Sequence, residues 1–389
     1  MARKPVIALY SDTYLPACDG VVSSIVNFRG ELLRRGYEVY LFVSGGPGRS
    51  RPHEGEDNVF VIKGMRFKRY PQYSFALFPF MASLKINEIN PDVIHAHTPF
   101  FVGVSALMTA RLNKIPMVGT FHTMVTDEDV IREYAASNPI VHRLLKKYAW
   151  SYARFFYTRC NTVTAPTMTM CRLLSMHGIH GAKCVPNSVD IGRFSPSVDG
   201  AQIRRKLFGD WDGATVLYVG RLSKEKKVDT MIRAMAHLRE RRIRAVIVGT
   251  GPAEHYYRRI AARMHLDNVR FAGFVPNGAL PGYYAAADLF CMPSTFETQG
   301  IAAIEAMASG KPVVGADHLA LKELIHDGKN GEKFAPGDSS DCARKIETVI
   351  NNMDSYNTMR KTAEKFSIER ATDRLLEIYG MAMEGMTLS

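Results

Sequence analysis

The chain has 389 residues, of which 46% are hydrophobic and 23% are charged. This length exceeds one ordinary hydrophobic core and predicts two domains, while the composition excludes the disordered and fibrous classes of protein. The formal net charge of +12 favours anionic partners, such as nucleotide phosphates, nucleic acid or an anionic membrane surface.

The sequence carries no obvious targeting segment. No run of about 18 apolar residues occurs, so we expect no transmembrane helix. The N-terminus leads straight into a strand-like run at Pro5–Tyr10 without a small-residue cleavage site, and the six cysteines form no CxxC pair. These features predict a cytoplasmic protein with reduced thiols.

Strand-like runs alternate with helical patterns along the whole chain, which predicts α/β architecture with parallel sheets covered by helices. In the first half, strands are expected at Val6–Tyr10, Val39–Val43, Val59–Ile62, Val93–His95, Met117–Phe121 and Thr162–Pro166. Helices are expected there at Val21–Arg35, Phe101–Asn113, Pro139–Tyr157 and Met168–His177.

A second series of strands and helices follows the loop-like stretch Pro186–Asp190. Its strands are expected at Thr215–Val219, Ala245–Val248, Val269–Phe274, Leu289–Met292 and Pro312–Gly315. Its helices, with two that end the chain, are expected at Asp229–Arg239, Ala253–Met264, Ala279–Ala286, Ile301–Ser309, Ser339–Asn352 and Ile368–Met383. Two such α/β units in tandem predict a central cleft between them, at the carboxyl ends of both sheets.

Loops after strands of the first half carry the first candidate residues. Gly20 closes the loop after the first strand, where it could bring the backbone close to a ligand or serve as an ordinary helix-entry glycine. His95 and His97 end one strand and His122 ends another. An HxH pair can bind metal, but no carboxylate or cysteine cluster completes a site, so structural or substrate-contacting roles are favoured.

Two stretches combine basic and aromatic residues, Lys63–Phe80 and Arg143–Arg159. The second has a helical pattern of the kind found in helices that lie on a membrane surface. A core helix with a solvated basic edge fits the same pattern equally well. No recognisable nucleic-acid module accompanies these bases, so we expect no nucleic-acid partner.

Cations follow the first strand of the second half, in the run Gly220–Lys227. Arg and Lys in a loop at the carboxyl end of a parallel strand can bind a diphosphate, with a solvated charge run as the alternative. Gly249–Pro252 follows the next strand, and by itself it indicates a tight turn.

The stretch Ser294–Gly310 joins a buried strand to an apolar helix and carries two carboxylates. The backbone N–H groups at Gln299, Gly300 and Ile301 would favour an anionic phosphate at the start of this helix. Glu305 lies inside the helix among apolar neighbours, where a carboxylate is costly unless something hydrogen-bonds to it. A ligand with hydroxyl groups could fill that role.

Together these motifs resemble the retaining glycosyltransferases of family four, which have the GT-B fold of two Rossmann-like domains. The resemblance rests on Glu297 and Glu305 with seven residues between them, on Gly220–Lys226, on Gly249–Pro252 and on Pro186–Asp190. It extends from the first strand to about Asp338. The combination is highly specific, although each motif alone is not.

The resemblance implies transfer of a sugar from a nucleotide sugar with retention of configuration and without a required metal or other cofactor. It implies an acceptor-binding domain at 1–188 and a nucleotide-sugar-binding domain at 189–367, with the C-terminal helix, about 368–389, packed back on the first. It assigns the diphosphate to Arg221 and Lys226.

The resemblance also assigns the rest of the donor. Glu305 would hydrogen-bond the ribose, and the backbone near Val275 would read the base. Glu297 and the backbone at Gln299–Ile301 would meet the donor sugar and β-phosphate. From the first domain, Gly20 would line the phosphate side, and His122 would lie against the sugar near the reacting centre.

Two departures from the commonest family pattern bear on the substrate. Lys227 stands where Gly or Asn often follows the motif lysine, and Thr298-Gln299 replaces a small residue and Phe. The second departure, and Thr120–Thr123 before a long basic helix, are similar to members that glycosylate diacylglycerol or related lipids.

We therefore expect transfer of glucose from UDP-glucose to a lipid acceptor at an anionic membrane, by a protein peripheral to the inner face of the cell membrane. A soluble acceptor, such as a polysaccharide, a small sugar or inositol phosphate, is the alternative with the same donor chemistry. A non-catalytic nucleotide-sugar or RNA-binding protein is the alternative of another class.

Overall fold

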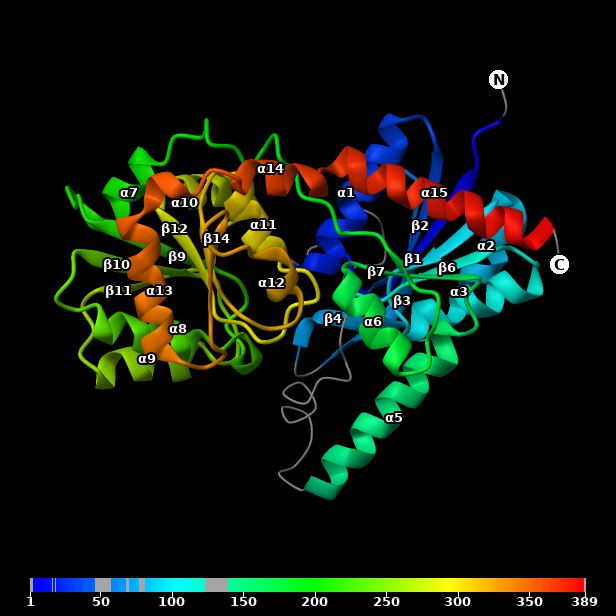
Figure 1. Ribbon diagram of the computed structural model, residues 1–389. Coiled ribbons are helices and arrows are strands. Elements are labelled where there is room, and N and C mark those ends of the chain that lie inside the picture. The colour runs from blue at the N-terminus through cyan, green and yellow to red at the C-terminus, as the bar shows by residue number, and fades with distance from the viewer. Residues whose placement is uncertain are drawn as a thin grey trace. The chain divides into compact units, whose positions relative to one another are not determined.

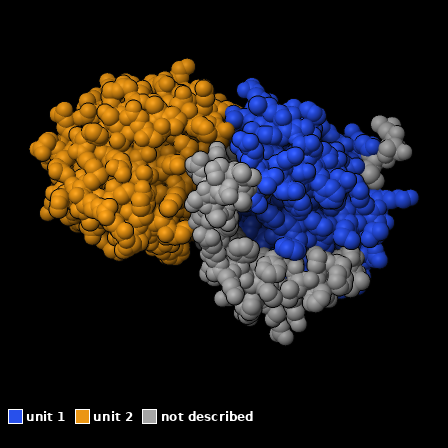
Figure 2. All heavy atoms as spheres, turned by 90° about the horizontal axis from the view of Figure 1, so that it is seen from below, with its two compact units in different colours: residues 1–188, 368–389 blue, residues 189–367 orange. Residues whose placement is uncertain are grey.

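The computed structural model describes residues 3–15, 17, 19–45, 57–67, 70–76, 81–122 and 139–387. Only the backbone is described for residues 63–67, 70–76, 81–84, 139–142 and 386–387. The chain divides into two compact units (Figure 2). Unit 1 comprises residues 1–188 and 368–389, and unit 2 comprises residues 189–367.

Unit 1 is built on an eight-stranded sheet with the order β4-β3-β2-β1-β5-β6-β7-β8 (Figure 1). Its strands are β1 (Val6–Ser11), β2 (Glu38–Gly45), β3 (Val59–Phe67), β4 (Tyr70–Ala76), β5 (Val93–Ala96), β6 (Met117–Thr120), β7 (Thr162–Ala165) and β8 (Lys183–Cys184). Its helices are α1 (Gly20–Arg34), α2 (Met81–Ile89), α3 (Phe101–Leu112), α5 (Pro139–Tyr157), α6 (Met168–Met176) and α15 (Ile368–Thr387). All neighbouring strands pair in parallel except β3 and β4.

Unit 2 has a six-stranded parallel sheet with the order β11-β10-β9-β12-β13-β14. Its strands are β9 (Ala214–Val219), β10 (Ile243–Val248), β11 (Val269–Gly273), β12 (Leu289–Met292), β13 (Val313–Ala316) and β14 (Gly331–Phe334). Its α-helices are α7 (Ala201–Phe208), α8 (Val228–His237), α9 (Glu254–Arg263), α10 (Leu280–Ala286), α11 (Ile301–Ala308), α12 (Leu319–Leu324), α13 (Ser339–Asn351) and α14 (Met359–Ala363). Its 3₁₀ turns are η1 (Lys224–Lys226), η2 (Asn277–Ala279), η3 (Met353–Ser355) and η4 (Glu364–Phe366).

The strand order of unit 2, numbered within the unit, is 3-2-1-4-5-6, which is the Rossmann order. The central strands are continuous apolar runs because helices cover both faces of a parallel sheet. All six residues of β1 and all four of β12 are buried. The predicted α/β class with two Rossmann-like units is confirmed.

Several short elements were missed by the sequence analysis. The strands β4, β8 and β14 and the helices α2, α7, α12 and α14 have no counterpart among the predicted elements, and β3 continues to Phe67 instead of ending at Ile62. β8 spans only two residues and α14 only five, so periodicity has too few positions to detect them. The antiparallel β4 lies at the edge of the sheet, where such strands are common.

The last helix, α15, belongs to unit 1. Its buried residues Ala371, Leu375 and Ile378 recur at helical spacing and join the apolar core around β1 and β2. Arg35, just beyond α1, donates to Asp373 at 2.5 Å and also to Glu31 at 2.6 Å. Helix α15 is thereby fixed to the first strands of unit 1.

Candidate active site

The candidate residues of unit 2 gather at the carboxyl edge of its sheet. The loop with Arg221 and Lys226 follows β9, and the loop with Glu297 follows β12. β9 and β12 are neighbours, and the strand order reverses between them. Such a switch point is where open α/β sheets bind ligands, outside the carboxyl ends of the strands.

An ion pair joins these two loops. The Lys226 ammonium donates to the Glu297 carboxylate at 2.7 Å and to the Phe296 carbonyl oxygen at 3.4 Å. The Glu297 side chain is 10% exposed and that of Lys226 is 21% exposed. The sequence analysis assigned both residues to the donor but did not predict their contact. A phosphate bound to Lys226 would either share the ammonium group with this carboxylate or displace the carboxylate from it.

Buried hydroxyl groups support the loop that follows β9. Tyr218 Oη donates to the Arg221 carbonyl oxygen at 3.2 Å, and Tyr257 Oη donates to the Ser223 carbonyl oxygen at 2.7 Å. Arg221 itself is partly exposed. Hydrogen bonds from two buried tyrosines thus hold the backbone that carries the two candidate cations.

The Gly249–Pro252 turn has a structural role. Gly249 has a φ of +128°, and a Cβ there would lie 1.9 Å from the Gly220 carbonyl oxygen. A Cβ at Gly251 would lie 2.5 Å from the Leu222 carbonyl oxygen. These glycines let the loops after β9 and β10 touch through their backbones, which gives the Gly249–Pro252 stretch a structural role.

Lys227 adopts a left-handed conformation, with φ 49° and ψ 34°, between η1 and α8. This explains why Gly or Asn often stands at this position in the resembling family, since both adopt that conformation at low cost. We expect Lys227→Gly to raise the free energy of unfolding by about 0.5–1 kcal/mol, measured by urea denaturation.

The matched control is Lys224→Gly, which removes a cation from the adjoining 3₁₀ turn. Lys224 has no positive φ, so glycine there should be neutral or destabilising. If Lys224→Gly stabilised the protein as much as Lys227→Gly does, the gain would come from the loss of charge, and the backbone explanation would be contradicted.

The loop after β12 leads into α11 through Gly300. Its φ of +83° is left-handed, and a Cβ there would lie 2.9 Å from Leu321 Cδ2. Ile301 is the first residue of α11, and Gln299 is buried. The N–H groups of the first turn of a helix have no partner within that helix, so this turn can accept an anion. Val275, which follows β11 on the same edge, is buried as well.

Glu305 has a protein partner that the sequence analysis did not foresee. Tyr284 Oη, from α10, donates to Glu305 Oε2 at 2.8 Å. Burial raises the pKa of Glu305 to about 7, although the Tyr284 hydroxyl and the Arg193 charge both lower it. The expectation that something must hydrogen-bond to this buried carboxylate is met in part by Tyr284. One hydrogen bond leaves the carboxylate able to accept more.

In unit 1 the candidate residues lie at the corresponding edge of the sheet. β1, β5 and β6 are neighbours, and the loops after them carry Gly20, His97 and His122 respectively. Gly20 is exposed and is the first residue of α1, which Asp19 caps by accepting from the N–H groups of Val21 and Val22 at 2.9 Å each.

Three buried histidines form a cluster at this edge. His97 Nδ1 lies 3.0 Å from His122 Nε2, and the ring centroids of His95 and His97 are 4.0 Å apart. Burial lowers the pKa of His95 to about 3 and that of His122 to about 4, and it holds the pKa of His97 well below the usual value. All three rings are therefore neutral at physiological pH.

The HxH motif was the sequence signal for this cluster, but it did not show that His97 contacts His122. Among the residues that the structure describes, no three His, Cys, Asp or Glu side chains are placed to hold a metal ion. The stretch 123–138, which continues from His122 toward α5, lies outside the described residues.

Asp12 is a further buried group at this edge that the sequence analysis did not single out. Its carboxylate accepts from Thr98 Oγ1 at 2.6 Å and from the Val102 N–H at 2.8 Å. Burial raises the pKa of Asp12 to about 6. It ties the loop after β1 to the first turn of α3, so its evident role is to shape the loop that leads to Gly20.

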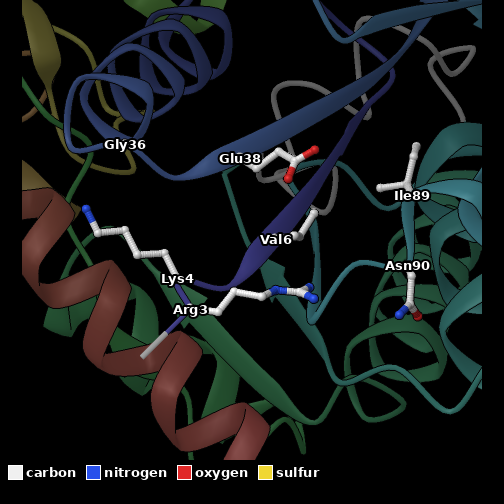
Figure 3. Close-up of a pocket in the computed structure, with 7 residues that line it drawn as sticks. All are labelled: Arg3, Lys4, Val6, Gly36, Glu38, Ile89 and Asn90. Atoms are coloured by element: carbon white, nitrogen blue, oxygen red, sulfur yellow. The ribbon is translucent and has the colours of Figure 1, made fainter. Parts of the chain in front are cut away.

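A hollow of about 520 Å³ lies at the opposite, amino edge of the unit 1 sheet (Figure 3). It is lined in part by Arg3, Lys4 and Asn90, together with the first residues of β1 and β2. Because ligands of open α/β sheets bind at the carboxyl ends of the strands, we give this hollow no part in the candidate active site.

Helix α5 extends away from the sheet of unit 1 (Figure 1). Its carboxyl half is anchored, since Trp150 is buried and stacks on His177 with ring centroids 3.6 Å apart. Its outer side is exposed and aromatic, and the Tyr152 hydroxyl donates to the Pro99 carbonyl oxygen, beside the start of α3. The name α5–α3 surface is used below for seven exposed residues, Phe100, Phe101, Leu144, Leu145, Tyr148, Tyr152 and Phe155.

Basic residues accompany the α5–α3 surface. Arg143, Lys146, Lys147 and Arg154 are all exposed, and the Arg159 guanidinium lies 4.0 Å from the centroid of the Phe155 ring. Helix α5 therefore has both a buried face and an exposed face, and the exposed face is aromatic as well as basic. Of the other such stretch, Lys63–Phe80, no side chain is described. Nor does any described helix combine the length and apolarity needed to cross a bilayer.

Comparison with known proteins gives two family matches that together span most of the chain. The family "Glycosyltransferase Family 4" matches residues 18–193, and "Glycosyl transferases group 1" matches residues 200–366. The chain is 28% identical over 383 residues to the alpha-monoglucosyldiacylglycerol synthase of Streptococcus pneumoniae, covering 96% of this chain and 85% of that protein.

Other relatives differ in the substrates that their names state. The GDP-mannose-dependent alpha-mannosyltransferase of Corynebacterium glutamicum is 28% identical over 335 residues, covering 84% of this chain and 75% of that protein. Among solved structures, Anabaena Alr3699/HepE in complex with UDP aligns with a TM-score of 0.76 at 21% identity, covering 97% of this chain and 100% of that one. The last likeness concerns the fold alone.

Proposed function

Because the chain is a retaining glycosyltransferase of family four with the GT-B fold, we propose that it transfers glucose from UDP-glucose to a membrane lipid of the diacylglycerol type. That it uses a nucleotide sugar follows from the family. The identity of the sugar, of the base and of the acceptor is the proposal. It is supported by the similarity to a glucosyldiacylglycerol synthase and by the α5–α3 surface.

We assign the nucleotide diphosphate to Arg221 and Lys226. Negative charge develops on the leaving diphosphate during transfer, and fixed cations stabilise that charge more than they stabilise the substrate. Lys226 is already oriented by its contacts with the loop after β12, so little reorganisation is needed at the moment of reaction. The first turn of α11, at Gln299–Ile301, would add backbone N–H groups to the β-phosphate.

The remaining donor contacts follow from position at the same edge of unit 2. Glu305, with one oxygen bound to Tyr284, would accept from the ribose hydroxyls, and the backbone near Val275 would meet the base. Glu297 would contact the donor sugar. From unit 1, Gly20 is assigned to the phosphate side and His122 to the sugar. Since Glu297 is ion-paired with Lys226, we give it no role as a nucleophile.

The observation that carries the lipid acceptor is the α5–α3 surface. Seven large apolar or aromatic side chains are exposed on α5 and at the start of α3, and α5 carries exposed cations as well. Such a combination is typical of helices that lie in the interface of an anionic membrane, where each buried CH₂ contributes about 0.8 kcal/mol and each cation about 1 kcal/mol. We therefore place the protein at the inner, anionic face of the cell membrane.

The enzymatic test combines a panel of UDP- and GDP-sugars with total membrane lipid, and identifies the product by mass spectrometry. A hexosyl lipid formed from UDP-glucose is the expected product. The same product should form in the presence of a chelator, because we propose no metal. A product formed only on a polysaccharide, a small sugar or inositol phosphate would replace the lipid acceptor with a soluble one, and no release of nucleotide with any acceptor would exclude catalysis.

The membrane part makes a separate prediction. The double variant Leu144→Glu with Tyr148→Glu is expected to lower binding to phosphatidylglycerol vesicles at least tenfold, because two apolar side chains that would enter the interface become charged. Vesicle sedimentation measures the bound fraction, with phosphatidylcholine vesicles as the neutral comparison.

The matched control is Met381→Glu, which places the same charge on an exposed apolar residue of α15. It should leave vesicle binding unchanged. Equal absence of binding of the unmodified protein to anionic and neutral vesicles would overturn the membrane proposal, and so would equal losses in the control and the double variant.

A further inference from the structure

We propose that the outer side of helix α3 is a further membrane-contact surface, which lies in the interface of an anionic bilayer along the length of the helix. This inference deepens the proposed function and rests on it for the presence of a membrane. It adds residues that the α5–α3 surface does not include, above all Met108 and Leu112. It also determines which face of the unit 1 sheet turns toward the lipid.

Helix α3 is apolar on the side that faces away from the sheet. Four of its twelve residues are exposed, namely Phe101, Met108, Arg111 and Leu112. Met108 is 55% exposed and Leu112 is 77% exposed, whereas the hydroxyl residues Ser105 and Thr109 are buried. A surface helix ordinarily turns its polar residues outward and its apolar residues inward. The reverse arrangement in α3 indicates an apolar partner for its outer side.

The outward apolar residues form one continuous stripe. Successive residues of an α-helix are about 100° apart, so positions 101, 104, 108 and 112 lie within about 80° of one another. The four residues at these positions are called the α3 stripe below: Phe101, the half-buried Val104, Met108 and Leu112. At 1.5 Å per residue the stripe is about 16 Å long. Phe101 belongs to the α5–α3 surface as well, so the two surfaces are continuous.

Helix α5 packs beside the start of α3 and not over the stripe. The Tyr152 hydroxyl donates to the Pro99 carbonyl oxygen, and a Cβ at Gly103 would lie 3.4 Å from Phe156 Cζ. These contacts involve the residues before α3 and the buried side of its first turn. They leave Met108 and Leu112 exposed further along the helix.

The opposite face of the same sheet has the ordinary pattern. Helix α1 joins β1 to β2 and α3 joins β5 to β6, in opposite directions along the sheet, so right-handed crossovers place them on opposite faces (Figure 1). Helix α15 packs against α1. Every exposed side chain described in α15 is charged except Met381 and Gly385. A single exposed apolar residue such as Met381 is normal, whereas a stripe of them marks an interaction surface.

The charges near the stripe fit an anionic membrane. Residues 101–114 contain two cations, Arg111 and Lys114, both exposed, and no carboxylate. In the neighbouring α2, Lys85 and Glu88 pair with each other at 2.7 Å and add no net charge. Cations beside apolar side chains favour an anionic bilayer interface. A contact between two copies through this stripe would instead bring together two surfaces of the same positive sign.

The stripe also places the candidate edge of unit 1 beside the lipid headgroups. Helix α3 runs back along the sheet between the parallel strands β5 and β6, so Phe101 lies at the carboxyl edge and Leu112 lies toward the amino edge. The four residues from His97 to Phe101 span at most about 14 Å of chain. Contact along the stripe lays the sheet along the membrane surface, so an acceptor headgroup would meet the edge that carries His97 while its acyl chains stay in the bilayer.

The test compares two double variants on opposite faces of the sheet. Met108→Glu with Leu112→Glu places two carboxylates in the α3 stripe, and Leu33→Glu with Met381→Glu places two on exposed residues of α1 and α15. Both pairs change the same residue types and the same net charge. We expect the first pair to lower binding of the whole protein to phosphatidylglycerol vesicles at least about tenfold, and the second to change it less than about threefold. Vesicle sedimentation measures both, and equal losses would overturn the inference.

Insertion of the stripe has a spectroscopic readout. Met108→Trp and Met381→Trp carry the same two native tryptophans, Trp150 and Trp211. With vesicles that contain acyl-brominated phosphatidylglycerol, we expect the Met108→Trp variant to show a blue shift and quenching beyond those of the unmodified protein. The Met381→Trp variant should show no such excess. A bound protein without excess quenching in the Met108→Trp variant would contradict the inference.

Failure of the proposed function gives a different result. If the unmodified protein binds neither phosphatidylglycerol nor phosphatidylcholine vesicles, the membrane proposal fails and the inference fails with it. If Leu144→Glu with Tyr148→Glu loses binding while the α3 double variant binds normally, the proposed function stands and the inference is overturned. Sedimentation velocity without lipid tests a second copy as the occupant. A dimer that the α3 double variant dissociates, and its control does not, would also overturn the inference.

Discussion

Replacing Lys226 by alanine is expected to raise the Kd for UDP about 10- to 100-fold. A charge-assisted hydrogen bond to phosphate contributes about 1.5–3 kcal/mol, and each 1.4 kcal/mol is a factor of ten in affinity. Isothermal titration calorimetry measures this loss directly. The control is Lys224→Ala, which removes an exposed cation from the same 3₁₀ turn and should change the Kd less than threefold.

The stability of the Lys226→Ala variant separates binding from folding. Its ion pair with Glu297 is partly screened, because the Lys226 side chain is 21% exposed. We therefore expect a loss of only about 1–2 kcal/mol in the free energy of unfolding, less than for a fully buried pair. A large fall in the melting temperature with an unchanged Kd for UDP would contradict the assignment of Lys226 to the diphosphate.

Replacing Glu297, the ion-pair partner of Lys226, should not raise the Kd for UDP as the loss of Lys226 does. Glu297→Gln removes the carboxylate that competes with phosphate for the ammonium, so the Kd for UDP should stay the same or fall. Transfer of sugar should nevertheless decrease, since Glu297 is assigned to the donor sugar. Weaker binding of UDP in both single variants, with additive free energies in the double variant, would show that the pair does not act as proposed.

The sequence predicted the fold and most of the elements because its signals are local. Central parallel strands such as β1 and β12 are continuous apolar runs, and the loops that follow them carry the motif residues. The strand order then brings those loops together at one edge of each sheet. What could not be predicted are contacts between side chains far apart in the sequence. Lys226 and Glu297 are 71 positions apart, and His97 and His122 are 25 apart.

Backbone conformation explains another part of what the sequence could not show. Lys227 was identified as a departure from the family pattern, but only its positive φ reveals that the departure costs strain. Glu305 was identified as a costly carboxylate, yet its partner comes from a different helix, 21 positions earlier. In both cases the sequence located the unusual residue, and the three-dimensional neighbours supplied the reason.

The elevated pKa of Glu305 gives the second large prediction. If the ionised carboxylate accepts from the ribose, the affinity for UDP should rise with pH through about 7, and it should be about tenfold lower at pH 6 than at pH 8. Glu305→Gln should abolish the part of this pH dependence that comes from Glu305. Tyr284→Phe removes a hydrogen bond that lowers the pKa of Glu305, so the midpoint should move to higher pH. Calorimetric titrations between pH 5.5 and pH 8.5 measure all three proteins.

The phosphate of UDP also titrates in this range, and 2′,3′-dideoxy-UDP is the control for that effect. It keeps the phosphates but lacks the ribose hydroxyls, so the difference between the two nucleotides isolates Glu305. If that difference is independent of pH, Glu305 does not bind the ribose as an ionised group. Equal affinities for the two nucleotides at pH 8 would exclude the ribose contact altogether.

Folding stability supplies an independent check with a definite sign. The folded pKa of Glu305, about 7, lies above the value of 4.5 expected for the unfolded chain. The favourable contribution of the neutral carboxyl is therefore complete below about pH 4.5 and is lost as the pH rises through 7. Glutamine stays neutral and can still accept from Tyr284. We expect Glu305→Gln to match the unmodified protein at pH 5 and to exceed it by about 1–2 kcal/mol at pH 8. Urea denaturation at the two pH values measures the difference, and an equal difference at both would show that this carboxyl titrates normally.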